Sequence, residues 1–128
     1  MKIILILPFA ILLASCASEP TMKYSKDGRF GSECNSFCSV TLAQLVITPE
    51  RYHGKIVQVY GLLSVNFEGY GVSSGEHEIW VEMSKGQIEK YKKYDGKVGY
   101  VKGIFDGTNT GHFGMWGGAI HSVTRFGK

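Results

Sequence analysis

The sequence lacks several of the short motifs that mark catalytic and nucleotide-binding sites. It contains neither a phosphate-binding P-loop nor the glycine pattern of a dinucleotide-binding fold. No two of its histidines show the His-x-His or His-x-x-x-His spacing of a zinc site. We therefore expect a protein that is not an enzyme, with no catalytic residue, no metal ligand and no cofactor.

The apolar run near the start of the chain, Ile3–Leu13, is too short to span a membrane. Its length and the basic Lys2 before it are typical of a signal peptide. The run ends in Leu13-Ala14-Ser15-Cys16, which resembles the bacterial lipobox of one aliphatic residue, two small residues and a cysteine. The resemblance implies that residues 1–15 are removed and that Cys16 becomes a lipidated N-terminus. The alternative is an ordinary secretory signal with an incidental cysteine.

The residue after the lipobox bears on the destination of the protein. Ala17 stands where an Asp is typical of lipoproteins retained in the inner membrane of enteric bacteria. By this resemblance we expect a lipid anchor in the outer membrane, with the protein facing the periplasm. Residues 16–37 hold Pro20, Gly28 and Gly31 without a sustained period, so they are predicted to form a tether. About 20 flexible residues would give it a reach of roughly 25 Å.

Cysteine is scarce, with three residues in 128. Apart from Cys16, the chain has Cys34 and Cys38, with three residues between them where a thioredoxin motif has two. No histidine follows Cys38, which excludes c-type haem attachment, and the absence of a second pair leaves a zinc site weakly supported. In an oxidising compartment we therefore expect a structural disulfide between Cys34 and Cys38.

Neither sign of charge is in large excess. Loss of residues 1–15 would remove Lys2 alone from the 14 basic residues, so the mature chain would carry 13 basic and 11 acidic residues. This weak field and the periplasmic address make nucleic acid an unexpected partner. The partners that we expect are the membrane, through the lipid anchor, and an envelope protein or a glycan.

A repeat organises residues 38–128, which are predicted to form the folded domain. Residues 51–63 are echoed by residues 93–105, and both copies read basic-Tyr-polar-Gly-Lys before an apolar strand. In each copy we expect a helix to end, a left-handed glycine to follow, and a strand to leave at once. Gly61 and Gly103, near the middle of these strands, predict bending or close approach of another backbone.

The remaining elements follow from capping and alternation. Thr41 with Gln44, and Ser84 with Gln87, look like capping boxes that begin two short helices. Strands are expected over about residues 55–65, in a short segment that ends near residue 73, around residues 79–83 and after residue 96. A last strand is expected over residues 113–120 and 122–126, where glycines predict bending. The predicted core is Val57, Val59, Leu63, Val81, Val101, Phe105 and Ile120.

This order of elements predicts a mainly β fold, a small five-stranded OB-like barrel with two short helices, because a helix separates the third and fourth strands. Three further segments are distinctive: Ser39–Leu42, Pro49–Lys55 and Gly111–Gly114. Through them the chain resembles, over about residues 39–126, small proteobacterial lipoproteins of uncharacterised function. The resemblance implies the OB-like fold and no catalytic residues.

Aromatic residues are the candidates for binding. Tyr60, Trp80 and Tyr100 share outward parity on their strands, where OB barrels stack bases or sugars. We expect a binding module in which Trp80 anchors the partner, so that Trp80→Ala weakens capture and leaves the fold nearly intact. Packing of these rings under the helices or the tether is the opposing interpretation. An envelope enzyme, hydrolytic or metal-dependent, that uses His112 or His121 is the alternative function, although nine residues of unbroken strand would put these two on opposite faces.

Overall fold

The computed structural model of the chain describes residues 36–128, so the predicted signal peptide, Cys16 and Cys34 lie outside the described residues. The strands are β1 (Cys38–Ser39), β2 (Ile56–Asn66), β3 (Gly69–Ser74), β4 (His77–Val81), β5 (Val98–Asp106) and β6 (Ala119–Gly127). The helices are α1 (Leu42–Ile47), α2 (Pro49–Tyr52) and α3 (Lys85–Tyr91), with short 3-10 turns η1 (Lys92–Tyr94) and η2 (His112–Gly114). Within this part of the chain, no helix has the length and hydropathy needed to cross a membrane.

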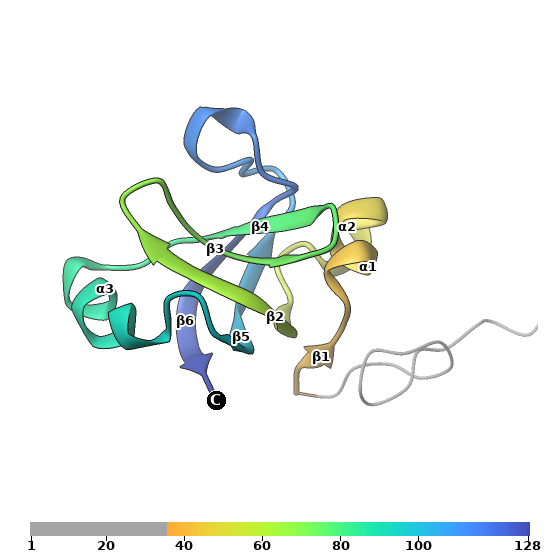
Figure 1. Cartoon of the computed structure of the whole chain (residues 1–128). Coiled ribbons are helices and arrows are strands. Elements are labelled where there is room, and N and C mark those ends of the chain that lie inside the picture. The colour runs from red at the N-terminus through yellow and green to blue at the C-terminus, as the bar shows by residue number, and fades with distance from the viewer. Residues whose placement is uncertain (1–35) are drawn as a thin grey trace, which may run out of the picture.

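The strands confirm the predicted OB-like arrangement. Five of them pair in a ring, β2–β3–β4–β6–β5, which the pairing of β5 with β2 closes. Within the ring, all neighbours are antiparallel except β4 and β6, which are parallel and share only two residue pairs, so the ring is weakest there. The sixth strand, β1, lies outside the ring and pairs in parallel with β2. Helix α3 connects β4 to β5, while α1 and α2 lie together on the other side of the molecule (Figure 1).

The two copies of the sequence repeat lie side by side, because β2 and β5 are neighbours in the ring. Each copy turns at the predicted left-handed glycine, Gly54 with φ 76° and Gly96 with φ 74°. The mid-strand glycines are sites of close approach, as expected. A Cβ atom on Gly61 would lie 2.5 Å from the backbone oxygen of Ser73, which no side chain tolerates.

Both predicted capping boxes are present. The Thr41 hydroxyl accepts a hydrogen bond from the Gln44 backbone N–H (3.2 Å), and the Gln44 side chain accepts one from the Thr41 N–H (2.9 Å). Ser84 and Gln87 repeat this exchange at the start of α3. The Gln87 side-chain amide also donates to the backbone oxygen of Val123 (3.2 Å), which ties α3 to β6.

All seven residues of the predicted core are buried, none with more than 1% of its surface exposed. They pack with Leu42 and Leu45 of α1, and with Tyr52 of α2. At the other side of the barrel, the Tyr91 ring of α3 stacks on Phe126 of β6 with centroids 5.1 Å apart. Burial of each large apolar side chain stabilises the folded state by about 1.5–3 kcal/mol, so the helices contribute to the stability of the core.

The prediction for the last strand was wrong in its first half. Residues 113–118 form no strand: η2 and a loop occupy this segment, and β6 begins only at Ala119. β6 is irregular, but at Ser122 rather than at the glycines on which the prediction rested: φ there is 51° and the pairing with β5 shifts register. The segment between β5 and β6 thus becomes a long loop that projects from the barrel, away from the C-terminus (Figure 1).

Candidate functional site

The three aromatic residues predicted to face outward fall into two separate groups. Tyr60 of β2 and Tyr100 of β5 are direct cross-strand partners with ring centroids 5.0 Å apart, and both are exposed. The Arg125 guanidinium lies 4.5 Å from the centre of the Tyr100 ring and donates to the Gln58 side chain (3.3 Å). Trp80 lies on β4, which pairs with neither β2 nor β5.

Trp80 instead organises an aromatic cluster beside β3 and β4. Its ring centroid lies 5.8 Å from that of Tyr70, 5.3 Å from that of Trp116, and 6.3 Å from that of His112. The contacts come from β3, from the β5–β6 loop and from η2. Trp80 is half-buried as a result, so the cluster holds the β5–β6 loop against the sheet.

The indole of Trp116 lies where two glycines leave the β3 surface bare. A Cβ atom on Gly71 would lie 2.4 Å from Cζ3 of Trp116, and one on Gly69 would lie 2.9 Å from Cζ2. Both distances are shorter than real contacts allow, so any larger residue would displace the ring. The β3 glycines thus form the seat of Trp116.

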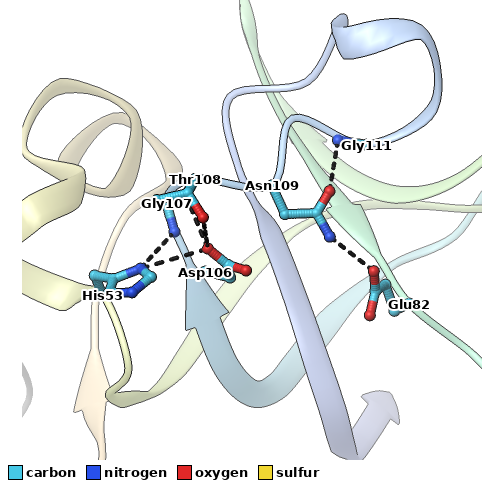
Figure 2. Close-up of polar contacts among 7 residues, drawn as sticks. All are labelled: His53, Glu82, Asp106, Gly107, Thr108, Asn109 and Gly111. Atoms are coloured by element: carbon cyan, nitrogen blue, oxygen red, sulfur yellow. Dashed lines mark hydrogen bonds and ion pairs between the residues drawn. The ribbon is translucent and has the colours of Figure 1, made fainter.

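The β5–β6 loop has its own hydrogen bonds. The Trp116 N–H donates to the Thr110 oxygen (2.9 Å), and the Gly117 N–H donates to the Glu78 oxygen of β4 (2.9 Å). Asn109 bridges from the loop to the residue that follows β4: its side chain donates to the Glu82 carboxylate (2.7 Å) and accepts from the Gly111 N–H (3.0 Å) (Figure 2). The loop is therefore presented by the barrel in a defined conformation.

The start of the loop is held by His53, which follows α2. Nδ1 of His53 accepts a hydrogen bond from the Gly107 N–H (3.1 Å) and lies 3.5 Å from Asp106 Oδ1 (Figure 2). The Thr108 hydroxyl and backbone N–H both donate to the same carboxylate (2.6 and 2.9 Å). The pKa of Asp106 lies below its ordinary value of 3.8. The largest cause is the hydrogen bond from the Thr108 hydroxyl; the bond from the Thr108 backbone and the nearby His53 also lower it.

A groove of about 550 Å³ separates this loop from the β2–β3 turn. Three of its lining residues are the most exposed large apolar side chains among residues 36–128: Phe67 (93%), Phe113 (82%) and Met115 (78%). Phe67 comes from the β2–β3 turn and the other two from the β5–β6 loop. Trp116 lines the groove from the sheet side. In OB-folds, the loops at these two positions bind oligonucleotides and oligosaccharides.

Phe113 is also unusual in its backbone. It has φ 59° and ψ 14°, the left-handed conformation that residues other than Gly, Asn and Asp seldom adopt. Its ring contacts that of His112, with centroids 4.0 Å apart, but its own surface remains exposed. A strained backbone that presents an apolar ring to solvent is typical of functional sites.

The charged residues that line the groove are Glu68 and Glu78. An adjoining hollow shares Ser64, Asn66, Glu78 and Trp116 with the groove and adds Asp95, so the two are continuous. Among residues 36–128, neither a Lys nor an Arg lines either of them. Beside its apolar side chains, the groove therefore carries carboxylates together with the polar side chains of Ser64, Asn66 and His112.

A second hollow, of about 590 Å³, is separate from the groove and lies beside Trp80. It is lined by Tyr70, Trp80, Glu82, Met83, Ser84, His121 and Ser122. Nδ1 of His121 lies 2.9 Å from the Ser122 hydroxyl. His112 lines the groove and not this hollow, so the two histidines singled out in the sequence face different cavities.

Two signs of chemistry can be checked on the described residues. Residues 36–128 contain no group of three or more His, Cys, Asp or Glu side chains placed to hold a metal ion. Gly71-Val72-Ser73-Ser74-Gly75 has the spacing of a nucleophile motif, but it lies on β3 and the β3–β4 turn. That motif works at a sharp turn from a strand into a helix, so its chemistry is not expected here.

Cys38 is disulfide-bonded, and the other two cysteines lie outside the described residues. Its predicted pairing with Cys34 stays a prediction, as does lipidation of Cys16. No protein-family model matches the chain, and no curated protein or solved structure is similar enough to it to count as a match. What the groove binds must be inferred from its own residues.

Sequence reasoning placed the outward aromatics on strands and missed the groove, whose exposed residues lie in turns and loops. Phe67 and Phe113 each stand within two residues of a glycine: Phe67 follows the first predicted strand, and Phe113 begins the segment predicted as the last one. The available signal was the presence of large apolar side chains inside glycine-rich turns, where polar residues are usual.

Proposed function

We propose that the protein is a lipid-anchored, non-enzymatic binding module of the bacterial cell envelope, and that the groove between the β2–β3 turn and the β5–β6 loop is its binding site. The partner is an envelope protein or a glycan. The lipobox at Cys16 supports the anchor, and the resemblance to small proteobacterial lipoproteins supports the envelope address.

One observation carries the assignment of the site: Phe67, Phe113 and Met115 are the most exposed large apolar side chains of residues 36–128, and all three line one groove. Scattered apolar residues are normal on a protein surface, but gathered ones mark interaction sites. Rigid aromatic anchors give most of the affinity in such sites at a small cost in conformational entropy.

In-cell photocrosslinking tests the site. A photoreactive phenylalanine analogue at position 67 or 113 keeps the native ring and should crosslink to a discrete partner. The same analogue at position 60 probes the Tyr60–Tyr100 face, and at exposed position 124 on β6 it reports background. Crosslinks from position 60 alone would move the site to the β2–β5 face. Equal yields from all four positions would contradict a specific site.

The anchor is tested separately. Cys16→Ser should leave the chain unprocessed and without fatty-acid label in growing cells, whereas the parent chain takes up labelled palmitate. Continued labelling of the variant would refute lipidation at Cys16 while leaving the groove proposal intact.

A second candidate function is a hydrolytic envelope enzyme. The observation in its favour is the hydrogen bond between His121 and Ser122, in a hollow that Glu82 also lines. If this function holds, the protein hydrolyses simple esters and His121→Ala abolishes that activity. For the metal-dependent form, zinc should raise the melting temperature, and the shift should vanish when both His112 and His121 are replaced by Ala. The binding-module proposal expects neither result.

A further inference from the structure

The charged side chains left without partners in the groove are carboxylates, which only accept hydrogen bonds. Within residues 36–128, the carboxylates of Glu68 and Glu78 have no hydrogen bond or ion pair. Asp95 uses one oxygen, which accepts from the Val65 N–H (2.8 Å) and from the Asn66 side chain (3.4 Å). A ligand must therefore supply donors, and cationic donors form the strongest bonds to carboxylates.

The Asn66 side-chain amide could have offered a ligand both a donor and an acceptor, but its hydrogen bonds are already made within the protein. The Asn66 side chain accepts from the Glu68 N–H (3.0 Å) and donates to the Ser64 hydroxyl (3.1 Å) as well as to Asp95. Sugar hydroxyls donate and accept together, and a site for them needs free donors as well as acceptors. The Trp116 indole N–H and the His112 ring remain as donors in the groove, so it is the charge of the Glu68 and Glu78 carboxylates that favours a cationic ligand over a neutral glycan.

The rims of the groove favour ligands with apolar side chains as well. Phe67 and Phe113 rise from opposite sides and can pack on aliphatic groups or on the face of a cation. Met115 also lines the groove, and its flexible side chain can adapt to varied apolar partners. A peptide offers both apolar and cationic side chains along one chain, whereas a neutral glycan offers neither.

The protein as a whole does not attract cations, because the mature chain carries 13 basic and 11 acidic residues. The carboxylates of Glu68, Glu78 and Asp95 form a local patch of the opposite sign. A neighbouring hollow, which shares Asn66 and Phe67 with the groove, is lined by Lys92 together with Glu89 and Asp95. Attraction of a basic ligand would therefore be confined to the groove.

We propose that the groove binds a peptide segment of another protein that carries Lys or Arg side chains beside apolar ones. The apolar side chains pack on Phe67, Phe113 and Met115, and the cations meet Glu68 and Glu78. This inference rests on the proposed function and narrows its partner to a protein.

Titration of the full chain, purified in detergent, tests the inference. The probes are a ten-residue peptide of alternating Lys and Leu, its Glu and Leu counterpart, and a trimer of N-acetylglucosamine. The chain has two tryptophans, Trp80 and Trp116, which touch each other beside the groove, so intrinsic fluorescence reports on this site. We expect a saturable change with the Lys peptide alone.

Matched variants separate the groove from general charge effects. Glu68→Gln with Glu78→Gln should weaken binding of the Lys peptide by about fivefold or more, since two ion pairs are lost. Glu50→Gln with Glu76→Gln changes the net charge equally, outside the groove, and should leave binding unchanged. Phe113→Ala should weaken binding without altering its dependence on salt.

Equal weakening in the two double variants would overturn the inference, as would saturable binding of the Glu peptide or the absence of a response to every probe. Saturable binding of the saccharide that Phe113→Ala abolishes would also overturn it, while leaving the proposed function in place with a glycan as partner. Absence of crosslinks from positions 67 and 113 in cells would instead remove the proposed function itself.

Discussion

Nδ1 of His53 lies 3.5 Å from a carboxylate oxygen of Asp106, at the point where β5 leads into the β5–β6 loop. The same nitrogen accepts the Gly107 N–H. It can do so only while it carries no proton, and it can pair with Asp106 only when it does carry one. The two contacts therefore exclude each other, and His53 holds the base of the loop through one or the other.

Asp106→Asn should destabilise the protein in a pH-dependent way. The pKa of Asp106 is lowered in the folded state, so its charged form stabilises the fold above the ordinary value of 3.8. That contribution is lost as the pH falls through the lowered value. Asn keeps an acceptor oxygen for Thr108, so the variant isolates the charge.

Urea unfolding at several pH values measures this effect. The parent should be more stable than Asp106→Asn at pH 7, and the difference should shrink as the pH falls below 3.8. Glu76→Gln, in the exposed β3–β4 turn, controls for the change in net charge. A difference that is constant across this range would contradict the linkage.

Gly71→Ala should unseat Trp116. The new methyl group would lie 2.4 Å from the indole and 2.7 Å from the Ile79 backbone oxygen. Overpacking of this kind costs about 1–3 kcal/mol, and the displaced ring should shift tryptophan emission to longer wavelength. Gly86→Ala is the matched control, because nothing lies within 4 Å of its Cβ position on α3 and the helix should gain about 0.5–1 kcal/mol. Unchanged emission in Gly71→Ala would show that Trp116 does not depend on this seat.

Val101→Asp should abolish stable folding, while Val98→Asp should not. Val101 is fully buried at the centre of β5, and Val98 on the same strand is 54% exposed. An unpaired carboxylate in the core is expected to cost about 4 kcal/mol or more, which is a large part of the stability of a small domain. Thermal unfolding followed by circular dichroism gives the comparison. A Val101→Asp protein that melts like the parent would show that the strand register is wrong.

The barrel could be predicted because its signals are local. Each capping box is complete within four residues, and each left-handed glycine stands at a fixed place in the repeat. The alternation in residues 55–65 fixes which side chains of β2 point inward, and the buried Val57, Val59 and Leu63 follow it. These rules do not depend on distant parts of the chain.

The groove depends on contacts that sequence spacing does not encode. Residues 113–118 are apolar and glycine-rich, which also describes a bent strand. What makes them a loop is the seat of Trp116 on Gly69 and Gly71, some 45 residues earlier in the chain. The split between Tyr60 and Trp80 has the same origin, since outward parity does not say which strands of a closed ring are neighbours.

Trp80→Ala should lower the melting temperature by several degrees. Trp80 is half-buried and its ring contacts Tyr70, Trp116 and His112, so its loss leaves a gap beneath the β5–β6 loop. Capture of the partner should fall too, because the loop that carries Phe113 is no longer held. A variant with full stability and reduced capture would restore Trp80 as a direct anchor, as the sequence suggested.

Phe113→Gly should change stability and binding in opposite directions. Its left-handed backbone costs an L-residue roughly 1–2 kcal/mol and costs glycine nothing. The exposed ring contributes little packing in return. We therefore expect the melting temperature to stay level or rise slightly, while crosslinking of the partner from position 67 falls. Phe67→Gly, tested with the crosslinker at position 113, is the matched control: it removes an equally exposed ring from a residue outside the left-handed region, so it should weaken capture without any gain in stability. A Phe113→Gly protein that captures its partner as well as the parent does would mean that the strained ring serves no binding role.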